Sequence, residues 1–160
     1  MDIIPQLGLV ILLVFLNGFF VASEFALVGV RKTRIDELVK EGNPTAVLVQ
    51  KSLKNLDTFI SATQLGITIA SLGLGWVGEP FLARLIEPYL ANILPNGLVS
   101  LSSHGLSFAL AFLLITFLHI VLGELAPKSI ALQRAEKTSL LIITPLVLFT
   151  TIFKPFIFIL

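Results

Sequence analysis

Two carboxylates of this chain lie within sequence that is otherwise apolar. Glu124 belongs to Gly123-Glu124-Leu125-Ala126-Pro127-Lys128, which follows an apolar run over residues 98–122 whose only ionisable groups are His104 and His119. Glu24 ends the segment Asn17-Gly18-Phe19-Phe20-Val21-Ala22-Ser23-Glu24. A charge inside a membrane span costs about 2.5 kcal/mol or more on insertion scales, so it usually has a partner or a function. Both carboxylates are therefore candidates for binding a cation.

The sequence around these carboxylates offers the oxygen ligands that a hard divalent cation needs. Mg²⁺ prefers oxygen ligands in near-octahedral geometry. Pro127 lacks the N–H that would bond to the carbonyl of Gly123, so a free carbonyl is expected next to Glu124. Ligand type alone does not separate Mg²⁺ from Ca²⁺ or Mn²⁺. The side chains that offer suitable oxygens are Asn17, Ser23, Glu24 and Glu124.

Structural roles for the same residues stay open at this point. Glu24 is seven residues from Arg31 and could simply end a helix at the membrane interface. Glu124 could pair with Lys128, because residues at i and i+4 are neighbours on a helix. The neutral polar groups could serve only hydrogen bonds between helices, and a packed, neutral role is expected for His119.

The composition predicts an all-α polytopic membrane protein. The chain has 160 residues, of which 56% are hydrophobic and 13% are charged, whereas soluble domains carry about 25% charged residues. It has no cysteine, which excludes disulfides and thiolate chemistry. The net charge of +1 gives no reason to expect nucleic acid as a partner. We also expect no enzyme, because there is no HExxH motif, and the GxGxxG spacing at residues 73–78 ends a membrane helix rather than following a strand.

The first half of the chain predicts one span and a cytoplasmic helical hairpin. Residues 3–22 are mostly apolar, and the span continues to about Val30. Residues 31–55 hold six Lys/Arg and three acids, which favours the cytoplasmic side by the positive-inside rule. The turn signal Gly42-Asn43-Pro44 divides two short amphipathic helices, near residues 33–41 and 45–55.

Two further spans are expected. Residues 58–77 carry no charge, and Ala62, Gly66 and Ala70 recur at a spacing that lets membrane helices pack closely. Residues 79–97 contain three prolines and predict a separate interfacial helix on the outer side. The third span covers residues 98–123, and residues 126–139 return to the cytoplasm. The N-terminus is then outside, and Glu24 and Glu124 are expected at similar depth on helices that run in the same direction.

Residues 140–160 allow two interpretations. Hydropathy favours a fourth span, although Pro145, Lys154 and Pro155 interrupt it. The alternative is a bent helix along the inner interface. Because the sequence stops inside an apolar segment, we expect that it is cut from a longer protein.

Three motifs in this order resemble a known family. They are Asn17-Gly18-Phe19-Phe20-Val21-Ala22-Ser23-Glu24-Phe25-Ala26-Leu27, Thr63-Gln64-Leu65-Gly66-Ile67-Thr68 and Gly123-Glu124-Leu125-Ala126-Pro127-Lys128. Together they resemble the DUF21 transmembrane domain of the CorC/CNNM magnesium transporters. The resemblance covers essentially the whole chain, residues 1–160.

The resemblance implies a fold and an assembly. The family's membrane domain is a homodimer with three spans per protomer, and cytoplasmic CBS domains that bind ATP normally follow it. This chain contains no such domains. Since those domains are cytoplasmic, residues 140–160 are then expected to form a juxtamembrane belt helix with a cytoplasmic C-terminus, which replaces the fourth span.

The resemblance also implies Mg²⁺ transport across the cell membrane, with export driven by Na⁺ entry. The ion is expected between the first and third spans, at Ser23, Glu124 and the carbonyl of Gly123, with Asn17 and Glu24 as weaker candidates. The competing hypothesis is a membrane Mg²⁺ sensor or scaffold that binds the ion without transporting it. An intramembrane enzyme is a third and less favoured hypothesis.

Overall fold

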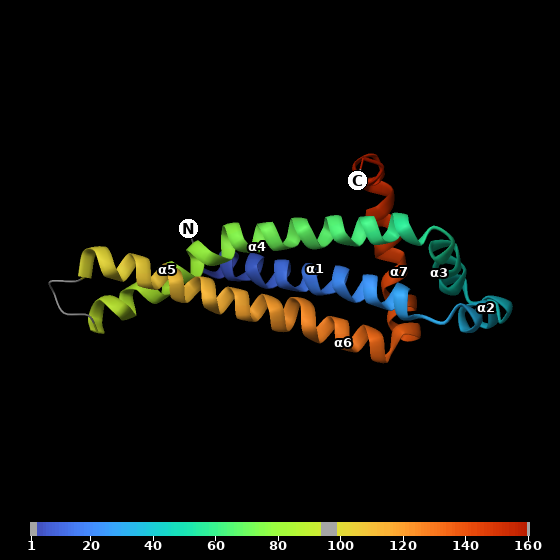
Figure 1. The fold of residues 1–160 in the computed structure, drawn as a ribbon, viewed down its shortest axis with the longest axis horizontal. Helices are drawn as coiled ribbons and strands as arrows, with labels where there is room; N and C mark the ends of the chain where they lie inside the picture. The colour runs from blue at the N-terminus through green and yellow to red at the C-terminus, as the bar shows by residue number, and fades with distance from the viewer. Residues whose placement is uncertain (1–2, 94–98, 160) are drawn as a thin grey trace.

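A computed structural model describes residues 3–93 and 99–159, with the side chains of residues 3–89 and 105–159. These residues form helices joined by short turns. Three long rods lie side by side (Figure 1): α1 (Ile3–Gly29), α4 (Leu56–Ile93), and a third made of α5 (Val99–Leu118), η1 (His119–Leu125) and α6 (Ala126–Gln133). The remaining helices are α2 (Lys32–Lys40), α3 (Pro44–Lys54), α7 (Ala135–Ile152) and α8 (Lys154–Ile157).

The two short helices after the first span are confirmed, and each bound lies within one residue of its prediction. The turn between them has the expected local chemistry. Gly42 takes a φ of +86°, a conformation that glycine adopts at no steric cost. The Asn43 side chain then caps α3 by accepting from the backbone N–H of Thr45 at 3.0 Å and of Ala46 at 3.2 Å. Pro44 follows at the first helical position, where its missing N–H costs nothing.

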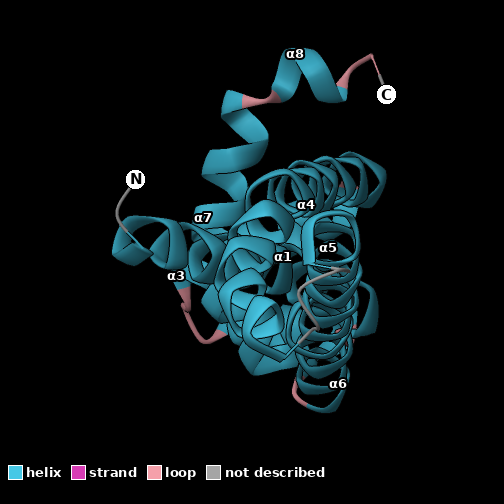
Figure 2. Ribbon diagram, turned by 90° about the vertical axis from the view of Figure 1, so that its left-hand side faces the viewer, coloured by secondary structure: helices cyan, strands magenta, loops and turns pink. Residues whose placement is uncertain are grey.

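The first long helix is the centre of the bundle. Figure 2 shows α1 between α4, the α5–α6 rod and α7, and the same helices contact α1 in the structure. Contacts between α1 and α4 pair Leu13 with Gly73, Phe20 with Gly66, and Glu24 with Thr63. Residue numbers increase along α1 as those of the contacting residues decrease along α4, so the two helices run antiparallel. At Gly66 an added Cβ would lie 2.5 Å from the Phe20 ring, so this glycine sets how closely the two helices approach.

The prediction of a separate outer helix at residues 79–97 was wrong. A single helix, α4, continues through Pro80 and Pro88 to Ile93, and residues 94–98 lie outside the described chain. A proline removes one backbone hydrogen bond but leaves the others of the helix intact. Figure 1 shows α4 changing direction between its green and yellow-green parts, which is the bend expected of proline within a helix.

The third rod also differs from its prediction. The helix does not end at Gly123 but continues to Gln133, so most of the polar segment at residues 126–139 is helical. The break expected at Gly123 and Pro127 is a seven-residue π-helix, η1, rather than an interruption. His104 falls among the residues whose side chains are not described.

The helix α7 crosses the end of the bundle instead of running along it (Figure 1). Its buried side chains join a core shared with α1, α2 and α3, which also includes Leu27, Ile35 and Val49. The buried residues that α7 contributes are Ile142, Ile143 and Leu146. This packing ties α7 and the short helices to the same end of α1. Pro145 is accommodated inside α7, and a turn at Phe153 leads into α8.

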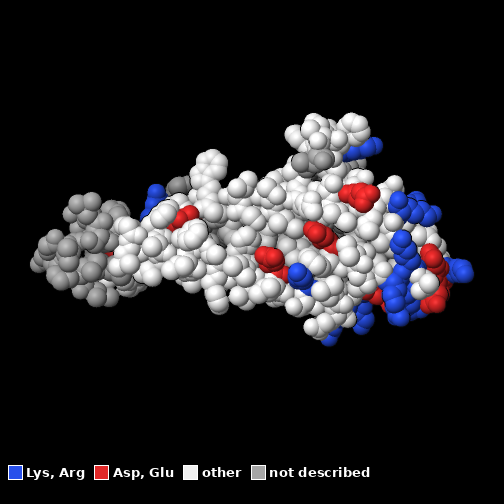
Figure 3. Space-filling view, viewed as in Figure 1, with Lys and Arg blue, Asp and Glu red and all other residues white. Residues whose placement is uncertain are grey.

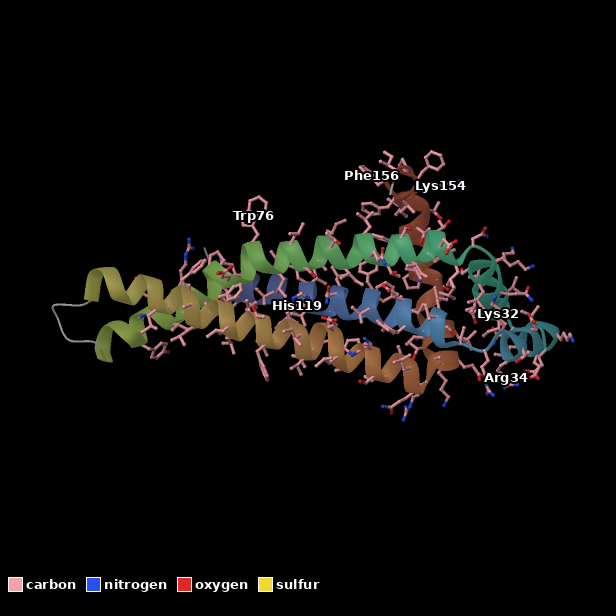
Figure 4. All side chains as sticks on the ribbon, in the orientation of Figure 1. Lys32, Arg34, Trp76, His119, Lys154 and Phe156 are labelled. Atoms are coloured by element: carbon pink, nitrogen blue, oxygen red, sulfur yellow. The ribbon has the colours of Figure 1, made fainter. Side chains whose placement is uncertain are left out.

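The surface of the rods is that of a membrane protein. Large apolar side chains such as Leu72, Leu113 and Phe117 are exposed along them, and Trp76 projects outward from α4 (Figure 4). Most Lys and Arg side chains in view gather at the α2–α3 end (Figure 3). Four helical stretches are long and apolar enough to cross a membrane: Ile3–Gly29, Leu56–Tyr89, Gly105–Gln133 and Ala135–Ile152. The chain is a multi-pass membrane protein.

Candidate metal centre

The π-helical segment η1 faces the middle of α1. Asn17, which is 1% exposed, donates from Nδ2 to the backbone carbonyl of Gly123 at 2.9 Å. The sequence predicts that this carbonyl lacks its helical N–H partner, because Pro127 cannot donate. The side chain of Asn17 takes the place of that partner. Short π-helical segments are frequent at functional sites.

Two glycines allow α1 and the third rod to come this close. A Cβ at Gly123 would lie 2.9 Å from Nδ2 of Asn17 and 2.9 Å from Cδ2 of His119. A Cβ at Gly18 would lie 3.0 Å from Cγ of Pro127. These distances leave no room for a methyl group at Gly123 unless its neighbours shift.

A chain of hydrogen bonds links three helices around Asn17. Ser71 of α4 lies 3.1 Å from Oδ1 of Asn17 and 3.3 Å from Nε2 of His119. One proton arrangement satisfies every contact: His119 donates to Ser71, Ser71 donates to Asn17, and Asn17 donates to Gly123. The chain begins and ends on η1 and passes through α4 and α1. His119, labelled in Figure 4, is partly buried.

The other two polar candidates on α1 have local partners. Ser23 is fully buried and donates to the carbonyl of Phe19 at 2.6 Å. Its proton is engaged, but the oxygen keeps lone pairs that can accept a bond or bind a cation. Glu24 is half-buried, and its Oε2 lies 3.3 Å from the hydroxyl of Thr63 on α4, which also donates to the carbonyl of Ile60 at 2.8 Å.

Glu124 lies on the exposed side of η1 in the single chain. Within the described part of the chain Glu124 makes no salt bridge, so it does not pair with Lys128. The ammonium of Lys128 instead lies 4.4 Å from the centre of the Phe25 ring, a cation–π contact. The structural alternative for Glu124, pairing with Lys128, is therefore absent from this arrangement.

The sequence of this chain is similar to those of known proteins. Residues 8–160 match the family described as the cyclin M transmembrane N-terminal domain. The chain belongs to the cyclin M family. It is 52% identical over 160 residues to the UPF0053 protein YhdT of Bacillus subtilis, which covers all of this chain and 34% of that protein. It is 48% identical over 161 residues to YhdP of the same organism, covering all of this chain and 35% of YhdP.

A more distant relative also matches nearly the whole of this chain. The chain is 36% identical over 158 residues to the uncharacterized protein Rv1841c of Mycobacterium tuberculosis, which covers 98% of this chain and 44% of that protein. The sequence thus spans about a third of the two Bacillus subtilis relatives.

Within this cyclin M domain, the structure brings some of the predicted site residues together and separates others. Asn17 meets Gly123 directly, and Gly123 precedes Glu124. Phe25, the neighbour of Glu24 in sequence, lies at the level of Lys128. The two carboxylates, which were expected at similar depth, are offset along the bundle: Glu24 lies nearer the α2–α3 end than Glu124 and contacts α4.

The centre of this cyclin M domain is built mainly of neutral oxygens. Within residues 3–93 and 99–159, no group of three or more His, Cys, Asp or Glu side chains could hold a metal. A cation here would meet hydroxyl, amide and carbonyl oxygens with a single nearby carboxylate. Such ligands suit a hard cation such as Mg²⁺. The structure adds Ser71 to the residues expected at this centre. A serine within a membrane span needs a hydrogen-bond partner, but only the antiparallel register of α1 and α4 places Ser71 beside Asn17.

Proposed function

We propose that this chain is the membrane domain of a transporter that exports Mg²⁺ across the cell membrane, coupled to the entry of Na⁺. The observation that carries the proposal is the carbonyl of Gly123, which lies in a π-helical segment beside Glu124 and meets the buried amide of Asn17 at 2.9 Å. Membership of the cyclin M family, which is linked to the transport of divalent cations, supports it.

The proposed Mg²⁺ site lies between α1 and η1. Glu124 supplies the negative charge, and the carbonyl of Gly123 and the hydroxyl of Ser23 supply neutral oxygens. Asn17 presents Nδ2 to the carbonyl of Gly123, so it becomes a ligand only if its amide turns and directs Oδ1 to the ion. Glu24, which is held by Thr63, is the weaker candidate.

The turn of the Asn17 amide gives the site two states. In one, Asn17 donates to Gly123 and accepts from Ser71. In the other, Oδ1 of Asn17 and the carbonyl of Gly123 both face a cation, and Nδ2 faces the hydroxyl oxygen of Ser71. Transport by alternating access exposes a binding site to the two sides of the membrane in turn. We propose that this exchange of hydrogen bonds accompanies binding and release.

We propose three membrane spans: α1, α4 and the α5–α6 rod. The N-terminus is then outside, and α2, α3 and α7 lie at the cytoplasmic face. The gathering of Lys and Arg at the α2–α3 end supports this orientation by the positive-inside rule. The crossing angle of α7 and its core with α2 and α3 support a belt helix rather than a fourth span.

The assembly is proposed from the family resemblance. We propose a homodimer of this domain within membrane lipid. Binding of ATP would belong to CBS domains in the longer protein, outside this chain.

Ion flux tests the function directly. The purified chain is placed in liposomes with a Mg²⁺-sensitive dye, and flux is followed with and without an opposing Na⁺ gradient. We expect Na⁺-dependent Mg²⁺ flux that is lost in Glu124→Gln and kept in Glu41→Gln, which removes an exposed charge on the turn after α2. Mg²⁺ binding without flux would favour the sensor or scaffold instead. Flux that persists in Glu124→Gln would contradict the proposed site.

A further inference from the structure

A polar pocket of about 570 Å³ opens at the α2–α3 end of the bundle. It lies where the end of α1 meets the start of α2 and the corner between α6 and α7. Its charged lining consists of four cations and one acid: Arg31, Arg34, Arg134, Lys137 and Glu136. Arg34 is labelled at this end of the molecule in Figure 4.

The acid in this pocket is already paired. Glu136 lies 3.4 Å from Arg34, and Arg34 also bonds to Glu37 at 2.9 Å. The hydrogen bond to Glu37 and the charge of Glu136 raise the pKa of Arg34 above its usual value. Arg34 is thus balanced by two carboxylates. The other three cations of the pocket form no ion pair within the described part of the chain, so the pocket keeps a net positive charge.

The pocket borders the apolar surface of the bundle. Leu132, which lines it, is 52% exposed, and Val28 on the last turn of α1 is 57% exposed. At Gly29 a Cβ would lie 3.5 Å from Cβ of Ala135 and 3.6 Å from Cδ2 of Leu132, so the end of α1 abuts the α6–α7 corner closely. A ligand here would meet cations on one side and lipid-facing side chains on the other.

The start of α7 adds to the positive potential. Ala135, Glu136 and Lys137 form its first turn and line the pocket, and no side chain caps this turn. The N-terminal N–H groups of a helix carry partial positive charge and attract anions. Their contribution reinforces that of the three unpaired cations.

We propose that this pocket binds the phosphate headgroup of an anionic phospholipid from the cytoplasmic leaflet, with the acyl chains along Val28 and Leu132. Basic pockets beside membrane helices on the cytoplasmic side bind such headgroups. Such a lipid would tie α1 to the α6–α7 corner, and so fix the belt helix against the bundle. The proposal uses the orientation in which the α2–α3 end is cytoplasmic, and it does not depend on Mg²⁺ transport.

Native mass spectrometry of the purified chain tests the proposal. The chain is titrated with dioctanoyl phosphatidylglycerol, dioctanoyl phosphatidylcholine or inorganic phosphate, and the bound species are counted. The variant Arg134→Gln/Lys137→Gln removes two cations of the pocket. The control Lys40→Gln/Lys51→Gln removes two exposed cations from α2 and α3, away from the pocket.

We expect the parent to prefer phosphatidylglycerol over phosphatidylcholine. The affinity should fall about tenfold or more in the pocket variant, since each cation near a charged lipid contributes about 1 kcal/mol, and should change little in the control. An equal loss in both variants, or no preference in the parent, would overturn the proposal. Inorganic phosphate that binds as strongly as the lipid would indicate a free-anion site instead.

A second measurement applies if the pocket variant does not fold. Salt screens charge–charge attraction, so added NaCl should weaken the binding of phosphatidylglycerol to the parent and leave that of phosphatidylcholine unchanged. Binding of phosphatidylglycerol that is insensitive to salt would contradict the proposal.

Discussion

The residues at the centre of this protein are mostly neutral. A buried amide, a backbone carbonyl, a hydroxyl and a histidine form one hydrogen-bonded chain from His119 through Ser71 and Asn17 to Gly123. Buried polar groups are costly unless they are paired, and each member here has a partner. The close approach of η1 to Asn17 that this chain requires depends on the small size of Gly123.

Replacing Gly123 with alanine should therefore damage both stability and ion binding. The added Cβ would lie 2.9 Å from both Asn17 and His119, and such overpacking typically costs about 1–3 kcal/mol. We expect a lower melting temperature in detergent and weaker Mg²⁺ binding by calorimetry.

The matched control for this substitution is Gly105→Ala. Gly105 lies in the same rod, and a Cβ there would have nothing within 4 Å. We expect it to leave stability and Mg²⁺ binding close to those of the parent. If Gly123→Ala behaved like Gly105→Ala, the close packing of η1 against α1 would not be needed for the site.

At the scale of elements, the register between α1 and α4 holds the site together. It places Ser71 beside Asn17 and Thr63 beside Glu24. Gly66 lies between these two contacts, against the ring of Phe20, which is buried in the core. The small-residue spacing of α4 thus serves packing within one chain.

Substituting Gly66 with alanine should separate α1 from α4. The new Cβ would lie 2.5 Å from the ring of Phe20, and relieving this contact should cost about 1–3 kcal/mol. We expect a clear loss of thermal stability. Gly75→Ala, on the same helix with open space at its Cβ position, should change stability little; an equal loss in both would show that helix packing is not the cause.

The sequence predicted the helices better than their ends. Apolar runs and the Gly42-Asn43-Pro44 turn located α1, α2 and α3 within a residue or two. The prolines of residues 79–97 favoured a separate helix, yet α4 continues through Pro80 and Pro88. Gly123 and Pro127 indicated a disturbed helix, but the sequence did not show that Asn17 of another element bonds to the carbonyl of Gly123 within a π-helix.

The candidate site could also be predicted only in part from the sequence. Residue types identified Asn17, Ser23 and Glu124 as sources of oxygen, and the missing N–H of Pro127 pointed to the carbonyl of Gly123. The sequence could not show that Glu24 lies nearer the α2–α3 end than Glu124, because depth depends on how α1 and η1 are offset. Whether these residues bind Mg²⁺ stays a prediction.

At the scale of the whole molecule, the placement of α7 decides whether the chain has three membrane spans or four. Length and apolarity would let α7 cross a membrane, but its buried side chains pack on α1 and α3, in a core that also includes residues of α2. We therefore propose that α7 lies on the same side of the membrane as α2 and α3. The side of the membrane on which the segment after α7 lies is therefore the most direct test of the topology.

The chain has no cysteine, so single cysteines can report on sidedness. Lys51→Cys on α3 and Phe158→Cys after α8 place thiols at exposed positions. In oriented vesicles, we expect a membrane-impermeant maleimide to label both from the cytoplasmic side only. Tyr89→Cys on the distal part of α4 should be labelled only from outside. Outside labelling of Phe158→Cys would indicate that α7 is a fourth span.

The most direct test of the central claim is Mg²⁺ binding to the purified chain by calorimetry, comparing the parent with Glu124→Ala. Glu124 is exposed and makes no salt bridge in the described part of the chain, so replacing it should leave the fold intact. We predict that the melting temperature is unchanged and that Mg²⁺ affinity falls about tenfold or more, equivalent to at least about 1.4 kcal/mol, while Glu41→Ala binds as the parent does. If Glu124→Ala binds Mg²⁺ as tightly as the parent, the proposed ion site on η1 is contradicted.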